Sequence, residues 1–477
     1  MDVISSFING AATSRPAAER FEKYYPATGA VIAEVEKASR EMLDEAVAIA
    51  SEAQKAWAAR SGVERGRILD NVARLLEAEN DALTKTEVLD VGKVWSEAVS
   101  GDVPCGAEAY AFYAALAATQ TGTAHSWPGA LGYTKRVPLG VCAGIGAWNY
   151  PTQIACWKSA PALATGNAFI LKPAEETPLI ANHIAHLMKE AGLPDGLFQV
   201  IHGDHEIGQA ICAHPGIAKV SLTGGIDTGK LIMAQSASTL KKVTLELGGK
   251  APLLVFADAD FDLAVQTALD ANFYTAGEVC SNATRVFVEA PLMPRFVEAL
   301  VERTKAMKIG DPMQSDTQIG ALISPQHLDK VLSYIEIGQS EGANLATGGK
   351  QVHPTGFEGG NFIEPTIFTG CTDEMRIVKE EIFGPVMSVL SFDTEDEAIA
   401  RANATEFGLG AGIITSDLTR AHRVADQLDA GNIWINSYNL IPPDWPFGGV
   451  KQSGFGREAS AFAVESYTQV KATYIQL

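Results

Sequence analysis

The chain has 477 residues, of which 47% are hydrophobic and 20% charged, with a formal net charge of −20 at pH 7. This length exceeds what one hydrophobic core supports, so we expect two or three domains of an ordinary globular protein. The acidic balance argues against nucleic acid and anionic membranes as partners and mildly favours neutral or cationic substrates. Because residues 1–7 lack a basic stretch followed by a long apolar run, we expect no signal peptide and a cytoplasmic location.

Short apolar runs and helix-period segments alternate along the chain, and this alternation predicts an α/β fold. Helical periodicity before residue 120 covers 40–60, 63–90 and 106–119. Apolar runs then predict four strands, at 141–145, 168–171, 197–201 and 220–222. Strands separated by helices indicate a parallel, doubly wound sheet.

A second series of such units begins after residue 250, with strands predicted at 252–256 and 284–288 and a helix at 292–306. Two segments differ from this pattern. Residues 120–139 predict a protruding hairpin, and 469–476 alternate in the manner of an edge strand.

The six cysteines include no close-spaced pair, so we expect neither a zinc site nor a disulfide framework. Cys280 follows a glycine-containing segment and precedes Ser-Asn, downstream of Glu246 in Glu-Leu-Gly-Gly-Lys. A thiol that is partly ionised near neutral pH can attack an aldehyde and later release a thioester to water, with a glutamate as base. Taken alone, Cys280 fits a buried small hydrophobe better.

Two turns that follow predicted strands are candidates for binding a nucleotide. Glycines 224, 225 and 229 open a helix, where a backbone without side chains can approach a pyrophosphate, although an ordinary tight turn explains them as well. Lys172-Pro-Ala-Glu175 ends another strand. Its glutamate can accept hydrogen bonds from an adenosine ribose and would repel a 2′-phosphate, which favours NAD over NADP.

Gly-Ile-Gly-Ala-Trp-Asn-Tyr-Pro (144–151) follows a further apolar strand. The amide of Asn149 can donate a hydrogen bond to an oxyanion without titrating. Capping a turn is the more ordinary role for an asparagine in such a place.

Seven motifs, in order, together resemble the aldehyde dehydrogenase superfamily along essentially the whole chain. They are Gly-Ala-Trp-Asn-Tyr-Pro (146–151), Lys-Pro-Ala-Glu (172–175), Leu-Thr-Gly-Gly (222–225), Glu-Leu-Gly-Gly-Lys (246–250), Gly-Glu-Val-Cys (277–280), Glu-Glu-Ile-Phe-Gly-Pro-Val (380–386) and Phe-Gly-Gly-Val-Lys-Gln-Ser-Gly-Phe-Gly-Arg-Glu (447–458). Within it, the chain is most similar to the betaine aldehyde and 4-trimethylaminobutyraldehyde dehydrogenases. Ala-Cys-Trp-Lys-Ser-Ala-Pro-Ala-Leu (155–163) and Asn-Ala-Thr-Arg-Val-Phe-Val (282–288) carry that finer similarity.

The resemblance implies three structural parts and an assembly. They are a Rossmann-like NAD-binding domain (1–119 and 140–248), a second α/β catalytic domain (249–452) and a small β oligomerisation arm (120–139 and 453–477). It also implies a homodimer or homotetramer.

Site roles follow from the same resemblance. Cys280 would be the nucleophile, Glu246 the base that activates the deacylating water, and Asn149 an oxyanion donor together with the Cys280 backbone N–H. Lys158 and Glu458 match a proton-relay pair, although an ordinary ion pair explains them equally well. Residues that would contact NAD are Gly146, Ala147, Trp148, Lys172, Glu175, Gly224, Gly225, Glu381 and Phe383.

The implied reaction is NAD-dependent oxidation of an aldehyde to the carboxylic acid, with an amino or trimethylammonio aldehyde as substrate. A broad aliphatic aldehyde or semialdehyde dehydrogenase is the alternative. Aromatic faces hold quaternary ammonium groups. The candidates are Tyr150, Trp157, Tyr274, Trp445 and Phe447. Asp102 and Glu108 are acids that would attract an ammonium, or else ordinary solvated side chains. Ile441 stands where some strict betaine aldehyde enzymes carry cysteine.

Three further expectations come from the resemblance. A potassium site, as in some relatives, would lie near Asp90, Leu240, Lys451 and Gly454. CoA-acylating relatives generally lack the glutamate base, so Glu246 argues against that reaction. A non-catalytic role would tolerate loss of Cys280 or Asn149, and both are present.

Overall fold

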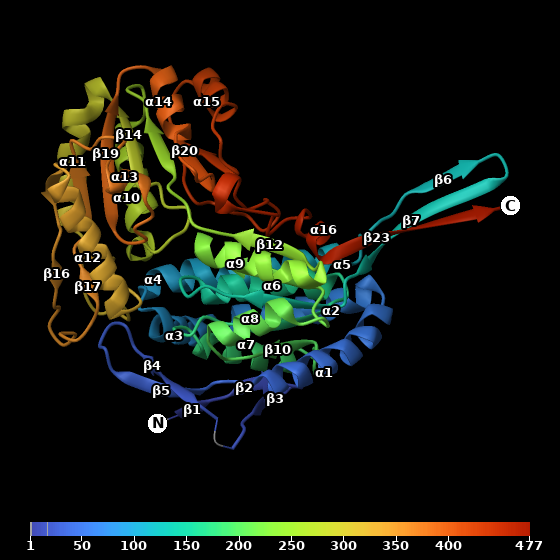
Figure 1. The fold of residues 1–477 in the computed structure, drawn as a ribbon. Coiled ribbons are helices and arrows are strands. Elements are labelled where there is room, and N and C mark those ends of the chain that lie inside the picture. The colour runs from blue at the N-terminus through green and yellow to red at the C-terminus, as the bar shows by residue number, and fades with distance from the viewer. Residues whose placement is uncertain (1, 17) are drawn as a thin grey trace.

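The computed structural model describes residues 2–16 and 18–477, which form two α/β units and a protruding arm (Figure 1). Each unit has its own sheet and its own hydrophobic core. The α/β fold with parallel sheets is therefore as predicted. No helix in the described part of the chain combines the length and the hydropathy needed to cross a bilayer.

The first sheet has eight strands in the order β22-β12-β11-β8-β9-β10-β2-β3. Its five parallel strands are β8 (Val141–Ile145), β9 (Ala168–Lys172), β10 (Phe198–Val200), β11 (Lys219–Thr223) and β12 (Lys242–Glu246). The antiparallel edge strands are β2 (Ser6–Ile8), β3 (Ala11–Thr13) and β22 (Gly454–Phe455). The chain runs outward from β8 through β9 and β10 and then returns to the other side of β8 with β11. The order therefore reverses between β8 and β11, and ligands of open α/β sheets bind beyond the carboxyl ends of strands at such a reversal.

Helices pack against this sheet because their apolar faces, together with the strands, form the first core. They are α1 (Arg40–Ala59), α2 (Gly62–Ala78), α3 (Asn80–Val91), α4 (Trp95–Glu97), α5 (Val103–Ala117), α6 (Pro151–Ala164), α7 (Leu179–Glu190), α8 (His205–Ala213), α9 (Ile226–Ser236) and α16 (Ala463–Tyr467), with a π-helical turn at Ala98–Asp102 and a 3₁₀ turn at Ala237–Thr239. The single helix predicted at 63–90 is two helices, because the backbone leaves helical geometry at Glu79.

The second sheet has seven strands in the order β15-β18-β19-β14-β13-β20-β21, all parallel except β15. Its strands are β13 (Pro252–Val255), β14 (Arg285–Glu289), β15 (Asn344–Thr347), β18 (Thr366–Thr369), β19 (Val386–Phe392), β20 (Gly410–Ile414) and β21 (Asn432–Ile435). Its helices are α10 (Phe261–Phe273), α11 (Met293–Lys305), α12 (Pro325–Ser340), α13 (Arg376–Lys379), α14 (Glu395–Asn403) and α15 (Leu418–Ala425), with 3₁₀ turns at Tyr274–Gly277, Ala290–Leu292 and Lys451–Ser453. Short sheets elsewhere contain β1 (Asp2–Ile4), β4 (Arg20–Tyr24) and β5 (Val31–Glu36), and β16 (Gln351–Val352) with β17 (Phe362–Ile363).

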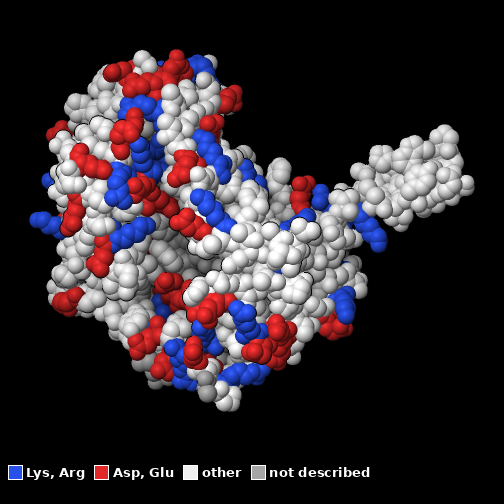
Figure 2. Space-filling model, viewed as in Figure 1, with Lys and Arg blue, Asp and Glu red and all other residues white. Residues whose placement is uncertain are grey.

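The arm is a three-stranded antiparallel sheet of β6 (Ala124–Trp127), β7 (Ala130–Pro138) and β23 (Thr468–Gln476) that extends away from both units (Figure 1). The predicted hairpin and the predicted C-terminal strand thus lie side by side. Its outer part carries no charged side chains on the face seen in Figure 2. Not all of 453–477 belongs to it, because β22 pairs with β12 in the first sheet and α16 contributes buried Ala463 and Tyr467 to the first core.

Candidate active site

A cavity of about 610 Å³ contains most of the residues that the sequence singled out for chemistry. Asn149 lines it from the turn after β8, Glu246 from the end of β12, and Cys280 from the loop between α10 and β14. Glu458, from the segment after β22, also lines it. The fold therefore brings together four side chains from four distant parts of the sequence.

Two glycines of Glu-Leu-Gly-Gly-Lys let neighbouring segments approach the loop after Glu246. A Cβ on Gly249 would lie 2.5 Å from the carbonyl oxygen of Cys280, and a Cβ on Gly248 would lie 2.2 Å from Oε2 of Glu381. Real side chains do not tolerate such distances. The motif thus allows the cysteine loop and Glu381 to pack directly against the strand end that carries Glu246.

Cys280 lies in apolar, acidic surroundings. Burial, together with the carboxyls of Glu381 and Glu246, raises the pKa of its thiol to about 12, although two backbone hydrogen bonds lower it. The thiol pKa therefore lies above that of the free thiol assumed from the sequence. An adjacent base or cation is needed to produce the thiolate.

This raised pKa predicts how Cys280 reacts with iodoacetamide in the NAD-free protein. Because only the thiolate is alkylated, the rate should rise about tenfold per pH unit between about pH 7 and pH 9. Mass spectrometry of the peptide that contains Cys280 measures it. A rate that levels off below about pH 8 would contradict the raised thiol pKa.

Glu246 is buried, and neither of its carboxyl oxygens has a hydrogen-bond partner among the described residues. Burial raises its pKa well above the ordinary value, the Glu458 carboxyl raises it further, and Lys158 lowers it. Its protonated form is therefore favoured relative to that of an ordinary glutamate. Both oxygens remain available to a ligand or water in the cavity.

Lys158 and Glu458 form a buried ion pair. Ser221 on β11 connects them, because its hydroxyl accepts from Lys158 Nζ at 3.0 Å and donates to Glu458 Oε1 at 2.8 Å. Since Glu458 also raises the pKa of Glu246, the pair is electrostatically coupled to the cavity. It is thus more than an isolated surface ion pair.

The amide of Asn149 donates to the carbonyl of Glu278 at 2.9 Å. It does not cap the following helix, α6, whose N-cap is Tyr150. The bond fixes the amide against the loop that carries Cys280. An amide has two N–H groups, so a second one remains for a ligand in the cavity.

The loops at the reversal of strand order carry the candidates for NAD binding. Gly225 is the N-cap of α9, and a Cβ there would meet no atom within 4 Å. Gly229 is the glycine that packing requires, because its Cβ would lie 2.7 Å from Leu247 Cδ1. Gly146, after β8, donates to the Lys172 carbonyl at 2.9 Å, and Lys172 Nζ lies 3.2 Å from Glu175 Oε1. The residues from 146–147, 172–175 and 224–225 thus gather at one edge of the sheet.

The remaining candidates for NAD binding include Glu381 and Phe383 in the second unit. Glu381 Oε1 accepts a hydrogen bond from the Gly249 backbone N–H at 2.9 Å. Phe383 has a left-handed φ of 64° and packs edge-on against Trp148 at 5.3 Å. His327, which sequence reasoning missed, packs 5.4 Å from Trp148, and its Nε2 donates to the Phe383 carbonyl at 2.6 Å. Burial lowers the pKa of His327 to about 4, so the ring is neutral and holds the Phe383 turn.

Four of the five predicted substrate aromatics line the cavity: Tyr150, Trp157, Tyr274 and Phe447. Trp157 and Phe447 meet edge to face at 5.6 Å, and the Trp157 indole N–H donates to Cys105 Sγ at 3.2 Å. Trp445 is absent from the lining and is 56% exposed. Its large neighbour in sequence, Phe447, faces the cavity in its place.

Of the two acids predicted to attract an ammonium group, Glu108 and Asp102, only one faces the cavity. Glu108 lines the cavity, but Asp102 is buried and paired with the buried ammonium of Lys93, so it cannot serve as a solvent-facing attractor. Asp270 lines the cavity as well and was missed, because a lone acid in a helix gives no sequence signal. Tyr438, also missed, lines it with its hydroxyl bonded to the Ser281 carbonyl at 2.7 Å.

The four positions named for potassium do not lie together within this chain. Lys23 Nζ donates to the backbone carbonyl oxygens of Asp90 and Glu176, at 2.6 Å each. The lysine ammonium therefore already provides a positive charge next to Asp90. Leu240 precedes β12, whereas Gly454 pairs with Glu246 at its other end. These positions therefore do not converge on one ion inside one chain.

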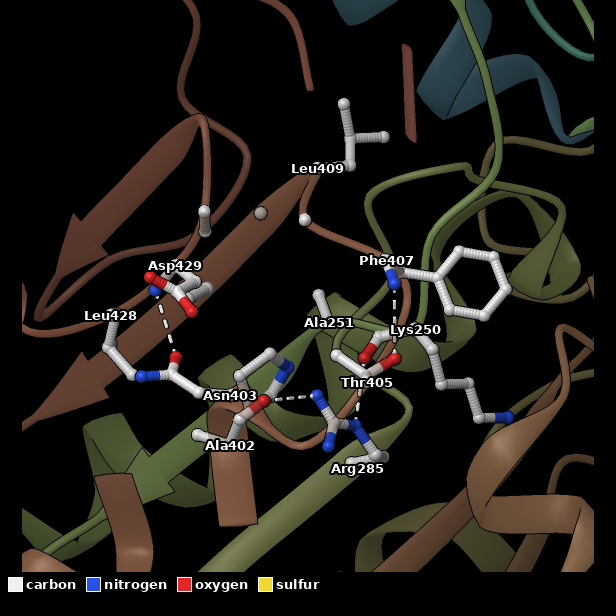
Figure 3. A pocket seen from close by; sticks show the side chains of 15 residues that line it. Lys250, Ala251, Arg285, Ala402, Asn403, Thr405, Phe407, Leu409, Leu428 and Asp429 are labelled. Atoms are coloured by element: carbon white, nitrogen blue, oxygen red, sulfur yellow. Dashed lines mark hydrogen bonds between the residues drawn. The ribbon is translucent and has the colours of Figure 1, made fainter. Parts of the chain in front are cut away.

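A second, small pocket lies around Arg285 and has a structural explanation (Figure 3). There the Arg285 guanidinium donates to the carbonyls of Lys250 and Ala402, at 2.8 Å each, and to that of Arg401 at 3.1 Å. A cation favours the carboxyl end of a helix, here α14. Arg285 of the Asn-Ala-Thr-Arg motif thus connects β14 to α14 and to the Glu-Leu-Gly-Gly-Lys segment.

Comparison with known proteins identifies the family. Residues 13–473 match the Aldehyde dehydrogenase family. The chain belongs to the aldehyde dehydrogenase family. It is 53% identical to a betaine aldehyde dehydrogenase of Sinorhizobium fredii over 99% of this chain and 97% of that protein. A betaine aldehyde dehydrogenase of Agrobacterium fabrum is 52% identical over 99% of this chain and 96% of that protein.

Solved structures of aldehyde dehydrogenases have the same fold over the whole chain. The NAD⁺ complex of an aldehyde dehydrogenase from Bacillus cereus superposes with a TM-score of 0.97 at 42% identity, covering 100% of this chain and 97% of the other. A betaine aldehyde dehydrogenase mutant from Staphylococcus aureus, solved with NAD⁺, gives a TM-score of 0.96 at 36% identity, covering 99% and 97%. The sequence-based assignment to aldehyde dehydrogenases is therefore confirmed.

Proposed function

We propose that this aldehyde dehydrogenase oxidises a cationic aldehyde, betaine aldehyde above all, to the carboxylic acid with NAD, through a thioester on Cys280. The observation that carries the proposal is the meeting of Cys280, Glu246 and Asn149 in one cavity of about 610 Å³. A nucleophile, a base and an uncharged donor are the parts that acyl transfer from an aldehyde requires. Relatives named betaine aldehyde dehydrogenase, at 53% identity, support the substrate.

The residues act in sequence. The Cys280 thiol gives its proton to water in the cavity, and its sulfur adds to the aldehyde carbon. The Asn149 amide and the Cys280 backbone N–H stabilise the oxyanion. NAD, when bound, accepts the hydride that must leave this carbon. Ionised Glu246 then removes a proton from the water that hydrolyses the thioester. Lys158 and Glu458 return that proton toward solvent, with Ser221 between them.

The residues at the reversal of strand order fit a dinucleotide. Gly224 and Gly225 open α9, where backbone N–H groups favour a pyrophosphate. Lys172 and Glu175 would hold the adenosine ribose, and Glu381 the nicotinamide ribose. Further contacts would come from Gly146, Ala147, Trp148 and Phe383. Neighbouring structures solved with NAD⁺ support this choice of cofactor.

Charge at the cavity supports a cationic substrate. Among the described residues that line it are four acids and no lysine or arginine. The acids are Glu108, Glu246, Asp270 and Glu458. Glu458 is paired with Lys158 and the pKa of Glu246 is raised, so Glu108 and Asp270 carry the attraction. Aromatic faces of Tyr150, Trp157, Tyr274 and Phe447 add cation–π attraction, each worth about 0.5–2 kcal/mol.

This proposal predicts the order of substrates. With saturating NAD, kcat/KM for betaine aldehyde should exceed that for hexanal by at least about tenfold, because two aromatic contacts suffice for that difference. The assay compares betaine aldehyde, 4-trimethylaminobutyraldehyde, 4-aminobutyraldehyde and hexanal at one salt concentration. A preference for hexanal would reject the cationic substrate and favour the broad aliphatic enzyme. Added CoA should change neither rate nor product.

We also propose three functional parts, with the first sheet binding NAD, the second unit carrying the cysteine, and the arm of β6, β7 and β23 joining subunits into a dimer or tetramer. The arm exposes large apolar side chains on strands with unpaired edges, which are an aggregation liability in a monomer. They include Trp127, Tyr133, Val470 and Tyr474. A reactive thiol suits a reducing compartment, so we place the enzyme in the cytoplasm.

A further inference from the structure

The turn that precedes Cys280 has a backbone conformation that its residues disfavour. Thr275 and Ala276 have φ of 50° and 48°, and Gly277 follows with φ of 77°. Left-handed backbone is uncommon for residues with a side chain, above all for a β-branched threonine. Two such residues in a row, Thr275 and Ala276, therefore need contacts that hold them.

Glu97 supplies the contact at the start of this turn. Its Oε2 accepts the backbone N–H of Thr275 at 2.9 Å, and its own carbonyl oxygen accepts from the Tyr274 hydroxyl at 3.4 Å. Glu97 ends α4 and leads into the π-helical turn at Ala98–Asp102. Such π-turns are rare and frequently found at functional sites. The carboxyl thus reaches 178 residues along the chain to the cysteine loop.

The Glu97 carboxyl that makes this hydrogen bond is enclosed by other residues. Glu97 is buried beside Lys93 and Asp102, which form an ion pair, and burial raises the pKa of Glu97 to about 8. The carboxyl is therefore neutral at pH 7, and glutamine matches it in charge and size.

Further hydrogen bonds connect Thr275 to Tyr150 and to Glu278, and they link the conformation of the turn to the position of Cys280. Tyr150 bonds through its hydroxyl to Thr275 Oγ1 at 2.7 Å, and the Glu278 backbone N–H donates to the Thr275 carbonyl at 2.9 Å. Glu278 is also the residue whose carbonyl accepts the Asn149 amide at 2.9 Å. Cys280 lies two residues further on. A shift of Thr275 would therefore move both the thiol and the oxyanion donor.

We propose that Glu97 is a positioning residue for the nucleophile: its carboxyl holds the left-handed turn at 275–277, and the turn sets the place of Cys280 in the cavity. The inference rests on the proposed function only in taking Cys280 as the nucleophile. Glu97 itself touches no reacting atom.

Four variants test this role. Glu97→Ala should lower kcat about 10- to 100-fold with little change in KM and should slow alkylation of Cys280 by iodoacetamide, since a misplaced nucleophile loses rate rather than binding. Glu97→Gln should stay within about threefold of the wild type, because its amide oxygen can accept the same N–H. Glu97→Asp, one methylene short of Thr275, should fall between them. Glu289→Ala removes a carboxyl that accepts the Ala257 N–H at 2.7 Å away from the cavity, and it should leave kcat unchanged.

Strain gives a sharper test. Ala276→Gly removes a Cβ from a left-handed position, where glycine is unstrained. In the Glu97→Ala background it should restore kcat at least about threefold, whereas in the wild type it should gain little. This recovery separates positioning from a general loss of packing, which an added glycine would only worsen.

Results that would overturn the role of Glu97 differ from results that would overturn the proposed reaction. A folded Glu97→Ala with wild-type alkylation and kcat overturns it. If Glu97→Ala does not fold, wild-type kcat in Glu97→Asp or an inactive Glu97→Gln overturns it, and the graded order supports it. Alkylation needs neither aldehyde nor NAD, so it reports the position of the thiol even if the assigned reaction is wrong.

Discussion

Cys280→Ala is expected to abolish NADH formation from aldehyde and NAD. Cys105 also lines the cavity, but its sulfur accepts the Trp157 indole N–H, and without a covalent intermediate on Cys280 the hydride has no route out of the aldehyde. We expect kcat to fall by at least about 10⁴-fold, as for nucleophiles elsewhere. Absorbance of NADH measures it, with circular dichroism to verify folding.

Cys371→Ala is the matched control, because Cys371 lies outside the cavity and its loss should leave kcat within about twofold. A Cys280→Ala protein that folds and turns over at a substantial steady rate would overturn the role assigned to the thiol.

Glu246→Gln should give one burst of NADH and then stall. Thioester formation can proceed, but glutamine cannot take a proton from the deacylating water, so steady turnover should fall about 10²- to 10⁴-fold. Stopped-flow absorbance should show a burst of about one NADH per active site. Steady turnover at the wild-type rate, or no burst at all, would contradict the assignment of Glu246 to deacylation.

The pH dependence of this step follows from the site. Because burial and the Glu458 carboxyl raise the pKa of Glu246, the rate of deacylation should rise with pH as the Glu246 carboxyl ionises. Glu458→Gln removes the carboxyl that raises the Glu246 pKa and frees the charge of Lys158, which lowers it. The rise of kcat should therefore move to lower pH in that variant.

The repeating units of the fold were readable because parallel strands are buried on both faces and appear as unbroken apolar runs. The run at 141–145 is β8 to the residue, and those at 168–171 and 220–222 differ from β9 and β11 by one residue at either end. The break at Glu79 was missed because Ala-Glu-Asn contains no strong helix breaker. The segment 453–467 was misplaced because its short strand depends on pairing with β12, which no local pattern reveals.

Site residues that belong to sequence motifs could be predicted. Residues whose role depends on a contact in the folded chain could not. Cys280, Glu246 and Asn149 stand in recognisable motifs, and all three line the cavity. His327 and Glu97 act through a bond to a distant backbone group, to Phe383 and Thr275, and a backbone group leaves no mark in the sequence. The raised thiol pKa was missed for a related reason. Burial comes from the packed fold, whereas the reference thiol titrates in water.

One measurement addresses the acyl intermediate itself. Glu246→Gln is mixed with betaine aldehyde and NAD, quenched in acid and digested, and the peptide that contains Cys280 is weighed. We expect the added mass of the substrate's acyl group on that sulfur, in proportion to the NADH formed. NADH release with an unmodified Cys280 peptide would contradict the account.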